Sequence, residues 1–148
     1  MVRTLVALLV LAAALTATPV VGTGPEPGCR STIRTVYPNP VTPDDAGERV
    51  TVTVPPDTHL RNLALDDGET VAHLPNRTAS GRVVLTTAPE RVGNRTSKTV
   101  VPLRGSLSLS NAGERVRLTC DGATADAMAY PDAPEGERWD GEAWTPLG

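Results

Sequence analysis

Apolar and polar side chains alternate along most of the chain after its first 22 residues. The alternation is clearest in ERVTVTV at 48–54 and ERVRLTC at 114–120, and each run begins inside a repeated pentapeptide, AGERV. A period of two places successive side chains on opposite faces of a strand. The Ala-Gly pair before each run suits a tight turn. Both copies therefore predict a turn followed by a half-buried antiparallel strand. The predicted inward residues are Val50, Val52 and Val54 in the first copy, and Val116, Leu118 and Cys120 in the second.

Further short strands are predicted where similar runs lie between turn signals. Pro55-Pro56 is expected to end the first AGERV strand, and Asp121-Gly122 to form the turn of a hairpin. No window after the leader shows sustained helical periodicity. The fold class is therefore all-β, an antiparallel sandwich of Greek-key or immunoglobulin-like type over residues 32–148. The other predicted strands are 32–37, 60–65, 70–74, 82–87, 100–103, 107–109 and 123–130, with a short one near the C-terminus.

The first 22 residues follow a different pattern, in which Arg3 precedes an apolar run that ends in small residues. The run is shorter than the roughly 20 residues that span a bilayer. Residues 1–22 are therefore predicted to be a signal peptide, with an uncleaved membrane anchor as the alternative, and 23–31 to be a Pro/Gly-rich spacer. Either alternative places the folded part outside the cytoplasm, secreted or on the extracellular face of the envelope.

Charge and length limit the possible partners. About 126 residues follow the leader, enough for one domain. Removing the leader removes Arg3, which leaves 13 basic and 17 acidic residues and a net charge of −4. This sign argues against nucleic acid as the default ligand. A protein or a component of the cell envelope is the expected partner, and a membrane is expected only through an uncleaved leader.

The two cysteines, Cys29 and Cys120, are predicted to form a disulfide, because an even pair in a secreted domain is usually oxidised. The closed loop of about 90 residues would stabilise the fold by about 4–5 kcal/mol on chain-entropy grounds. Lipid attachment at Cys29 is the alternative, although EPGC lacks the small or aliphatic residues that it requires.

No arrangement of catalytic or metal-binding residues is visible. His59 and His73 have no ligand at a recognisable spacing, and HExxH, CxxC and GxSxG strings are absent. Acidic pairs such as Asp66-Asp67 form turns in this context, and a Ca²⁺ site from loop carboxylates remains an alternative. We therefore predict no cofactor and no enzymatic activity. Two sequons, at Asn76 and Asn94, lie in expected loops and are the predicted glycosylation sites.

The stretch LRGSLSLSNAGERVRLTCDGATADAMAY resembles the second half of a lamin-tail domain, an immunoglobulin-like module. The sequence departs from the family pattern at Arg49, where an aromatic residue is usual, at Thr51, where an acid is usual, and at Leu63, where Trp is common. The resemblance gives structural roles to the motif positions, and Asp126 is expected to hold a neighbouring turn by accepting backbone N–H bonds. Those positions are Asn111, Gly113, Glu114, Gly122, Asp126 and Tyr130.

The segments YPNPV, LDDGE and WDGEAWTPLG are also similar to the leading domain of secreted phospholipase D-like proteins from haloarchaea. In that family a catalytic region with HxK motifs follows the sandwich, whereas neither histidine of this chain has the required Lys. The resemblance implies a non-catalytic lamin-tail domain that binds or tethers a protein, an envelope component or a hydrolase. The alternative is an accessory domain, or a truncated N-terminal part, of a phospholipase D-like or nuclease-like hydrolase.

Overall fold

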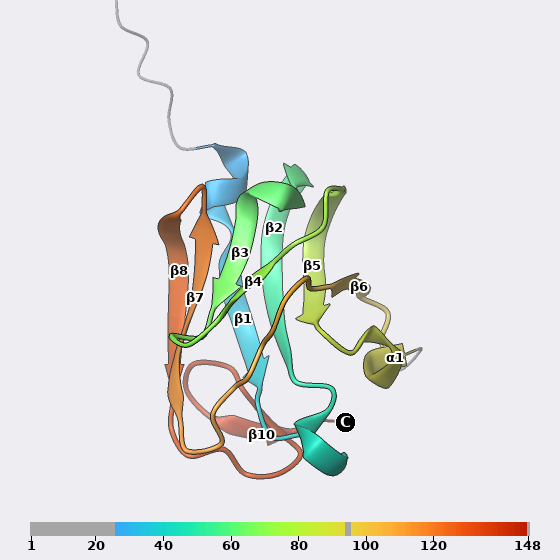
Figure 1. Ribbon diagram of the computed structural model, residues 1–148, viewed down its shortest axis with the longest axis vertical. Coiled ribbons are helices and arrows are strands. Elements are labelled where there is room, and N and C mark those ends of the chain that lie inside the picture. Colours follow the sequence, from blue (N-terminus) through green and yellow to red (C-terminus); the bar gives the residue numbers. More distant parts are fainter. Residues whose placement is uncertain (1–25, 94–95, 148) are drawn as a thin grey trace, which may run out of the picture.

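Two β-sheets face each other across an aliphatic core in the computed structural model, which describes residues 26–93 and 96–147 (Figure 1). The larger sheet has the order β10-β9-β1-β2-β5-β6, and the smaller sheet has the order β4-β3-β7-β8. The strand pairs are antiparallel except for β5 and β6, which are parallel. The predicted all-β sandwich is confirmed. The predicted signal peptide and Asn94 lie outside the described residues.

Ten strands and four short helical segments make up the described part of the chain. The strands are β1 (Thr32–Tyr37), β2 (Arg49–His59), β3 (Leu63–Asp66), β4 (Val71–His73), β5 (Thr78–Thr86), β6 (Thr99–Pro102), β7 (Glu114–Cys120), β8 (Ala123–Tyr130), β9 (Glu137–Trp139) and β10 (Trp144–Pro146). The helical segments are η1 (Pro27–Arg30), η2 (Pro43–Asp45), η3 (Leu60–Asn62) and α1 (Pro89–Val92).

The core has the composition that the alternating pattern predicts. All six predicted inward side chains of the two AGERV strands are buried, beside Leu65 and Leu85 of the neighbouring strands. Thr51, on the opposite face of β2 from Val50 and Val52, is also buried and is only 7 % exposed. Val84 of β5 and Val92 of α1 line the same pocket as Thr51. Thr51 therefore lies on the outer face of the larger sheet, in a hollow that it shares with side chains of β5 and α1.

Three predicted strand assignments were wrong in part. Pro55-Pro56 does not end β2, because the register with β5 shifts between Val54 and Thr58. A proline can occupy such a bulge, since its missing N–H is not required for the ladder there. The predicted strand 60–65 begins as η3, and only its second half pairs as β3. Residues 107–109 form no strand.

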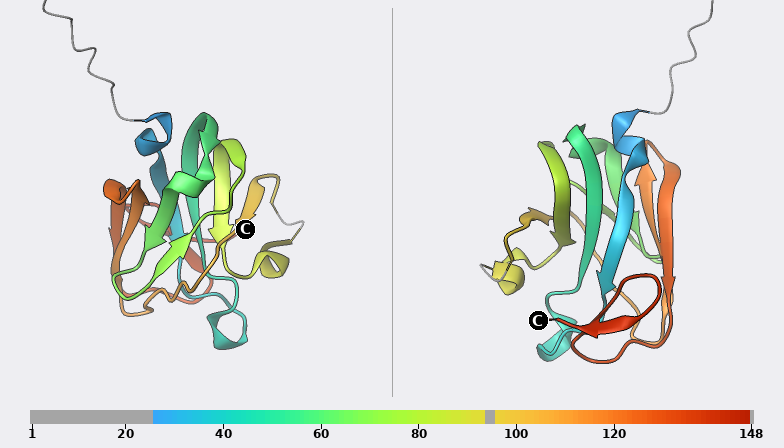
Figure 2. Two further views of the ribbon diagram at one scale, coloured as in Figure 1. Left: turned by 45° about the horizontal axis from the view of Figure 1, so that its top comes forward. Right: turned by 180° about the vertical axis from the view of Figure 1, so that it is seen from behind.

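The ends of the sandwich are closed differently (Figure 2). At one end η1 lies where the described chain begins, and its Cys29 is joined by a disulfide to Cys120 of β7, with the two Cα atoms 5.2 Å apart. The predicted disulfide is thus present, and Pro27–Arg30 of the predicted spacer 23–31 fold as η1. The C-terminal strands β9 and β10 lie at the opposite end (Figure 1). Among the described residues, no helix has the length and apolar character needed to cross a bilayer.

Candidate functional site

A pocket of about 530 Å³ opens on the outer face of the larger sheet. Tyr37 at the end of β1 and Arg49 at the start of β2 are register partners and form part of its floor. Its walls come from α1, β9, the segment 40–47 and the segment just before β6. These elements meet at the end of the sandwich opposite η1 (Figure 1). The pocket therefore lies away from the disulfide and from the point where the described chain begins.

The pocket is strongly cationic. Four basic side chains line it, and no Asp or Glu is among its lining residues in the described part of the chain. The whole chain carries a formal net charge of −3, so this concentration of positive charge runs against the overall balance. A cleft lined by one sign of charge focuses the field and attracts counter-ions. The four residues are Arg49, Arg91, Lys98 and Arg138.

Separate elements position these cations. The guanidinium of Arg49 lies 4.7 Å from the ring centroid of Tyr37, a cation–π contact that orients it over the sheet. Arg138 of β9 donates from Nε to the hydroxyl of Thr145 on β10, at 3.3 Å. No described residue forms a hydrogen bond or an ion pair with the side chain of Arg91 or Lys98. Those two cations remain available to a ligand.

The glycine of the first AGERV copy explains how Arg91 reaches the pocket. Gly47 has a φ of +103°, and a Cβ built on it would lie 3.1 Å from the Cβ of Arg91. A larger residue at position 47 would be strained and would also push α1 outward. The absence of a side chain at this position therefore lets α1 pack against the segment that leads into β2.

Apolar groups share the pocket with the cations. Val41, with 67 % of its surface exposed, and Leu147, with 36 %, both line it. Val71, on the other sheet, completes the set of exposed large hydrophobic residues in the described part of the chain. The pocket thus combines a cationic set with aliphatic surface, and it can accept an anion that carries an apolar group.

A second arrangement, the carboxylate bracket, holds the segment 108–110. The N–H of Ser108 donates to Asp67 Oδ2 at 3.0 Å, that of Leu109 to Glu48 Oε2 at 3.1 Å, and that of Ser110 to Glu114 Oε1 at 3.2 Å. These side chains take the donors that a strand ladder would use, which explains why no strand forms here. Glu48 and Glu114 are the glutamates of the two AGERV copies. Each copy therefore supplies one carboxylate that accepts a backbone N–H of the segment 108–110.

Burial and hydrogen bonding act on these carboxyl groups in opposite directions. Burial raises the pKa of Glu48 to about 7, against the opposing hydrogen bond from Leu109. Burial also raises the pKa of Glu114. Burial alone would raise the pKa of Asp67. Hydrogen bonds from the N–H groups of Ser108, Thr70 and Glu69 outweigh this effect, so the pKa of Asp67 is lowered. The bracket is occupied by backbone donors and serves the fold.

The motif residues of the second half lie around this bracket. Tyr130 Oη lies 2.9 Å from the carbonyl oxygen of Ser110, to which it donates, and 3.1 Å from Glu114 Oε1. Burial raises the pKa of the Tyr130 hydroxyl. Asn111 is exposed and donates from Nδ2 to Asp45 Oδ2 at 3.1 Å. The structure thus gives these residues packing and hydrogen-bonding positions.

Asp126 joins the two sheets. Its Oδ2 accepts the N–H of Ile33 at 2.7 Å, and Ile33 belongs to β1 of the larger sheet. The contact lies where the pairing of β1 with β2 shifts register between Ile33 and Thr35. The backbone donor that Asp126 accepts is thus in a strand of the opposite sheet, whereas a turn was expected. Gly122 lies in the β7–β8 turn with a φ of +84°.

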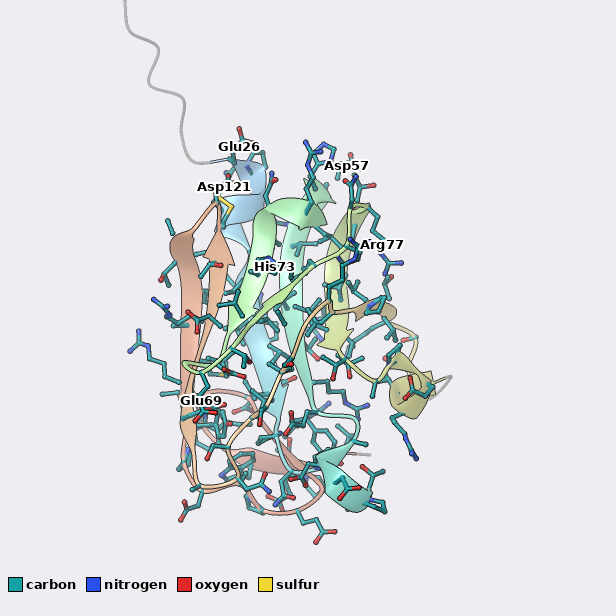
Figure 3. The ribbon with its side chains drawn as sticks, viewed as in Figure 1. Glu26, Asp57, Glu69, His73, Arg77 and Asp121 are labelled. Atoms are coloured by element: carbon teal, nitrogen blue, oxygen red, sulfur yellow. A yellow bond between two sulfur atoms is a disulfide. The ribbon has the colours of Figure 1, made fainter. Side chains whose placement is uncertain are left out.

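The other predicted positions do not converge on a site. Asn76 is exposed in the turn between β4 and β5, and His59 and His73 are exposed on β2 and β4. In Figure 3, Asp121 and Glu26 lie near the disulfide at one end of the sandwich, and Glu69 lies toward the other end. The potential metal ligands that come together among the described residues are Cys29, Cys120 and Asp121. The disulfide joins the two sulfurs of this group covalently, so it is not a metal site.

Sequence reasoning did not find the pocket, although one signal pointed to it. Arg49 and Thr51 depart from the lamin-tail pattern, and both line the pocket. The remaining cations are separated from them by tens of residues, so only the folded chain brings them together.

Comparison with known proteins finds no matching family model, no matching curated protein and no matching solved structure. The protein class that the structure itself defines is a disulfide-linked, two-sheet β-sandwich, and the resemblance to lamin-tail domains stays a prediction.

Proposed function

We propose that this chain is a non-catalytic binding module of the cell exterior, of the lamin-tail and immunoglobulin-like type. It holds its partner, a protein, an envelope component or a hydrolase, through an anionic group of that partner. The observation that carries this proposal is the pocket, where four cations meet in an acidic chain.

The chemistry of the pocket suits anion recognition. Three of its four cations are arginines, whose planar guanidinium groups bind carboxylate and phosphate oxygens in pairs. Two of the four cations, Arg91 and Lys98, have no partner among the described residues for their side chains. An incoming anion can therefore bind without first breaking an ion pair of these two side chains.

The position of the pocket suits a tethered module. Glu26, where the described chain begins, lies at the end of the sandwich that carries the disulfide (Figure 3), and α1 and the other segments that line the pocket lie toward the opposite end (Figure 1). A chain attached to the envelope on its N-terminal side would present the pocket outward. The disulfide is compatible with this extracellular location.

An NMR titration with sodium sulfate and sodium acetate, at constant ionic strength, tests the proposal. We expect amide signals of the pocket residues to shift with saturation in the natural protein. The double variant Arg91→Ala/Lys98→Ala should lose this response, and it keeps the Cβ of Arg91 that packs near Gly47.

The matched control is Arg104→Ala/Arg115→Ala, which removes the same charge from exposed positions away from the pocket, one between β6 and β7 and one on β7 of the other sheet. This variant should respond as the natural protein does. Equal responses in both double variants, or shifts outside the pocket alone, would contradict the proposal.

A further inference from the structure

We infer that the pocket binds a peptide segment in which a carboxylate side chain stands next to an aliphatic residue. This inference rests on the proposed function and names the chemical class of the partner. It is carried by the aliphatic surface beside the cations and by the acidic residues that adjoin the lining residues in sequence.

The aliphatic part of the pocket indicates a ligand with an apolar group. Val41 and Leu147 are exposed at the pocket, and Val92 of α1 is buried behind it. A small inorganic anion would contact the cations and leave Val41 and Leu147 in water. A ligand that also covers these two side chains gains the free energy of removing apolar surface from water.

The acidic neighbours of the pocket argue against an extended polyanion. Asp44 and Asp45 of η2 lie between the lining residues Thr42 and Ala46, and Glu90 precedes Arg91 in α1. A nucleic-acid backbone or an anionic membrane would bring many charges against these carboxylates. A single carboxylate that enters the pocket meets its cations and brings no further negative charge toward these three residues.

A peptide matches these features together. Its carboxylate can accept paired hydrogen bonds from a guanidinium, and its aliphatic neighbour can cover Val41 and Leu147. The hydroxyl of Thr35, on the floor of the same pocket, adds a partner for a peptide amide or carbonyl group. The pocket volume of about 530 Å³ is within the range of small-ligand sites, which is sufficient for two or three residues.

Three blocked tripeptides, titrated by NMR or calorimetry, test the contribution of the aliphatic contact and that of the carboxylate separately. They are acetyl-Leu-Glu-Val-amide, acetyl-Gly-Glu-Gly-amide without aliphatic side chains, and acetyl-Leu-Gln-Val-amide without the charge. We expect the first to bind about tenfold more tightly than the second, the factor expected when roughly 60 Å² of apolar surface leaves water. The third should not bind measurably.

A pair of variants tests which surface is responsible. Val41→Ser should reduce the preference for the Leu-Glu-Val peptide over the Gly-Glu-Gly peptide. Val71→Ser, which changes an exposed valine of β4 in the other sheet, should preserve that preference. Both valines are exposed, so folding of the two variants is expected to be equal. A preference that survives Val41→Ser would overturn the assignment of the aliphatic contact.

The remaining outcomes distinguish this inference from the proposed function. If acetate and the Gly-Glu-Gly peptide bind in the pocket as tightly as the Leu-Glu-Val peptide, the inference fails and anion binding stands. If no probe binds there, both fail. The last experiment is sedimentation of the protein with phosphatidylglycerol vesicles. If the natural protein sediments with them, Arg91→Ala/Lys98→Ala does not, and no peptide binds, the ligand is a lipid headgroup and the peptide assignment is overturned.

Discussion

Replacing Glu48 with Gln should change the pH dependence of stability in a defined way. Glu48 is 9 % exposed, and its Oε2 accepts the N–H of Leu109 at 3.1 Å. Gln has nearly the same shape, keeps an oxygen that can accept this bond, and cannot ionise. The substitution therefore removes the charge and leaves the contact in place.

The magnitude follows from the raised pKa. The pKa of Glu48 rises from the ordinary value of 4.5 to about 7 because the carboxyl group is buried. Between these pH values the unfolded chain loses the proton and the folded protein keeps it, so stability falls as pH rises. A full shift corresponds to about 3 kcal/mol, and we expect about 2 kcal/mol because water reaches part of the carboxyl group.

Urea unfolding of both proteins between pH 4.5 and 8, at constant ionic strength, provides the assay. At pH 4.5, Glu48→Gln should have about the same free energy of unfolding as the natural protein. At pH 8 the variant should be more stable by about 2 kcal/mol. Asp66→Asn is the control, because Asp66 adjoins the bracket in sequence and is not among the charges that raise the pKa of Glu48. A hydrogen bond from the N–H of Gly68 and the contact with Arg117 lower the pKa of Asp66, so that variant should be less stable by an amount that is constant over this pH range.

A pH-independent difference between the natural protein and Glu48→Gln would refute the reasoning. So would a difference of the opposite sign, in which Gln loses stability as the pH rises. The first result would mean that the Glu48 carboxyl group ionises as readily in the folded protein as in the unfolded chain, and the second that it ionises more readily in the folded protein.

Two further predictions concern the covalent link and the second turn. Replacing Cys29 and Cys120 together with Ser should lower the free energy of unfolding by about 4–5 kcal/mol, because the bridge closes a separation of 91 residues, and denaturant curves that coincide with those of the oxidised protein would contradict this. Gly113→Ala should lower the melting temperature far more than Gly122→Ala: both glycines have positive φ, but a Cβ at 113 would lie 2.6 Å from the carbonyl oxygen of Tyr130, whereas one at 122 meets nothing within 4 Å. Equal losses in the two variants would show that backbone conformation alone, without the contact to Tyr130, sets the requirement at 113.

Local patterns were sufficient to predict much of the fold. The bounds of β1 and β8 are those expected from the runs 32–37 and 123–130, and the inward residues of both AGERV strands are buried. Burial in a strand alternates with the residue number, so it can be read from neighbouring positions alone. The disulfide was also predictable, because only two cysteines are present to pair.

Local patterns predicted the wrong secondary structure where a contact with a distant segment sets the backbone conformation. Residues 107–109 alternate like a strand, yet the N–H of Leu109 bonds to Glu48, which lies 61 residues earlier in the chain. Pro55-Pro56 looks like the end of a strand, yet the bulge opposite β5 accommodates it. In both places a contact between remote segments overrides the local preference.

The sequence by itself therefore determined the class of fold, most of the strands and the covalent link. The tertiary structure alone decided the two clusters of charged side chains, the carboxylate bracket and the cationic pocket. The pocket unites Arg49 and Arg138, which are 89 residues apart in the printed sequence, through the pairing of β1 with both β2 and β9. The alternation of side chains shows which face of a strand is buried. The position of a charged residue relative to another strand depends instead on the order of the strands in the sheet, which arises only when the whole chain packs.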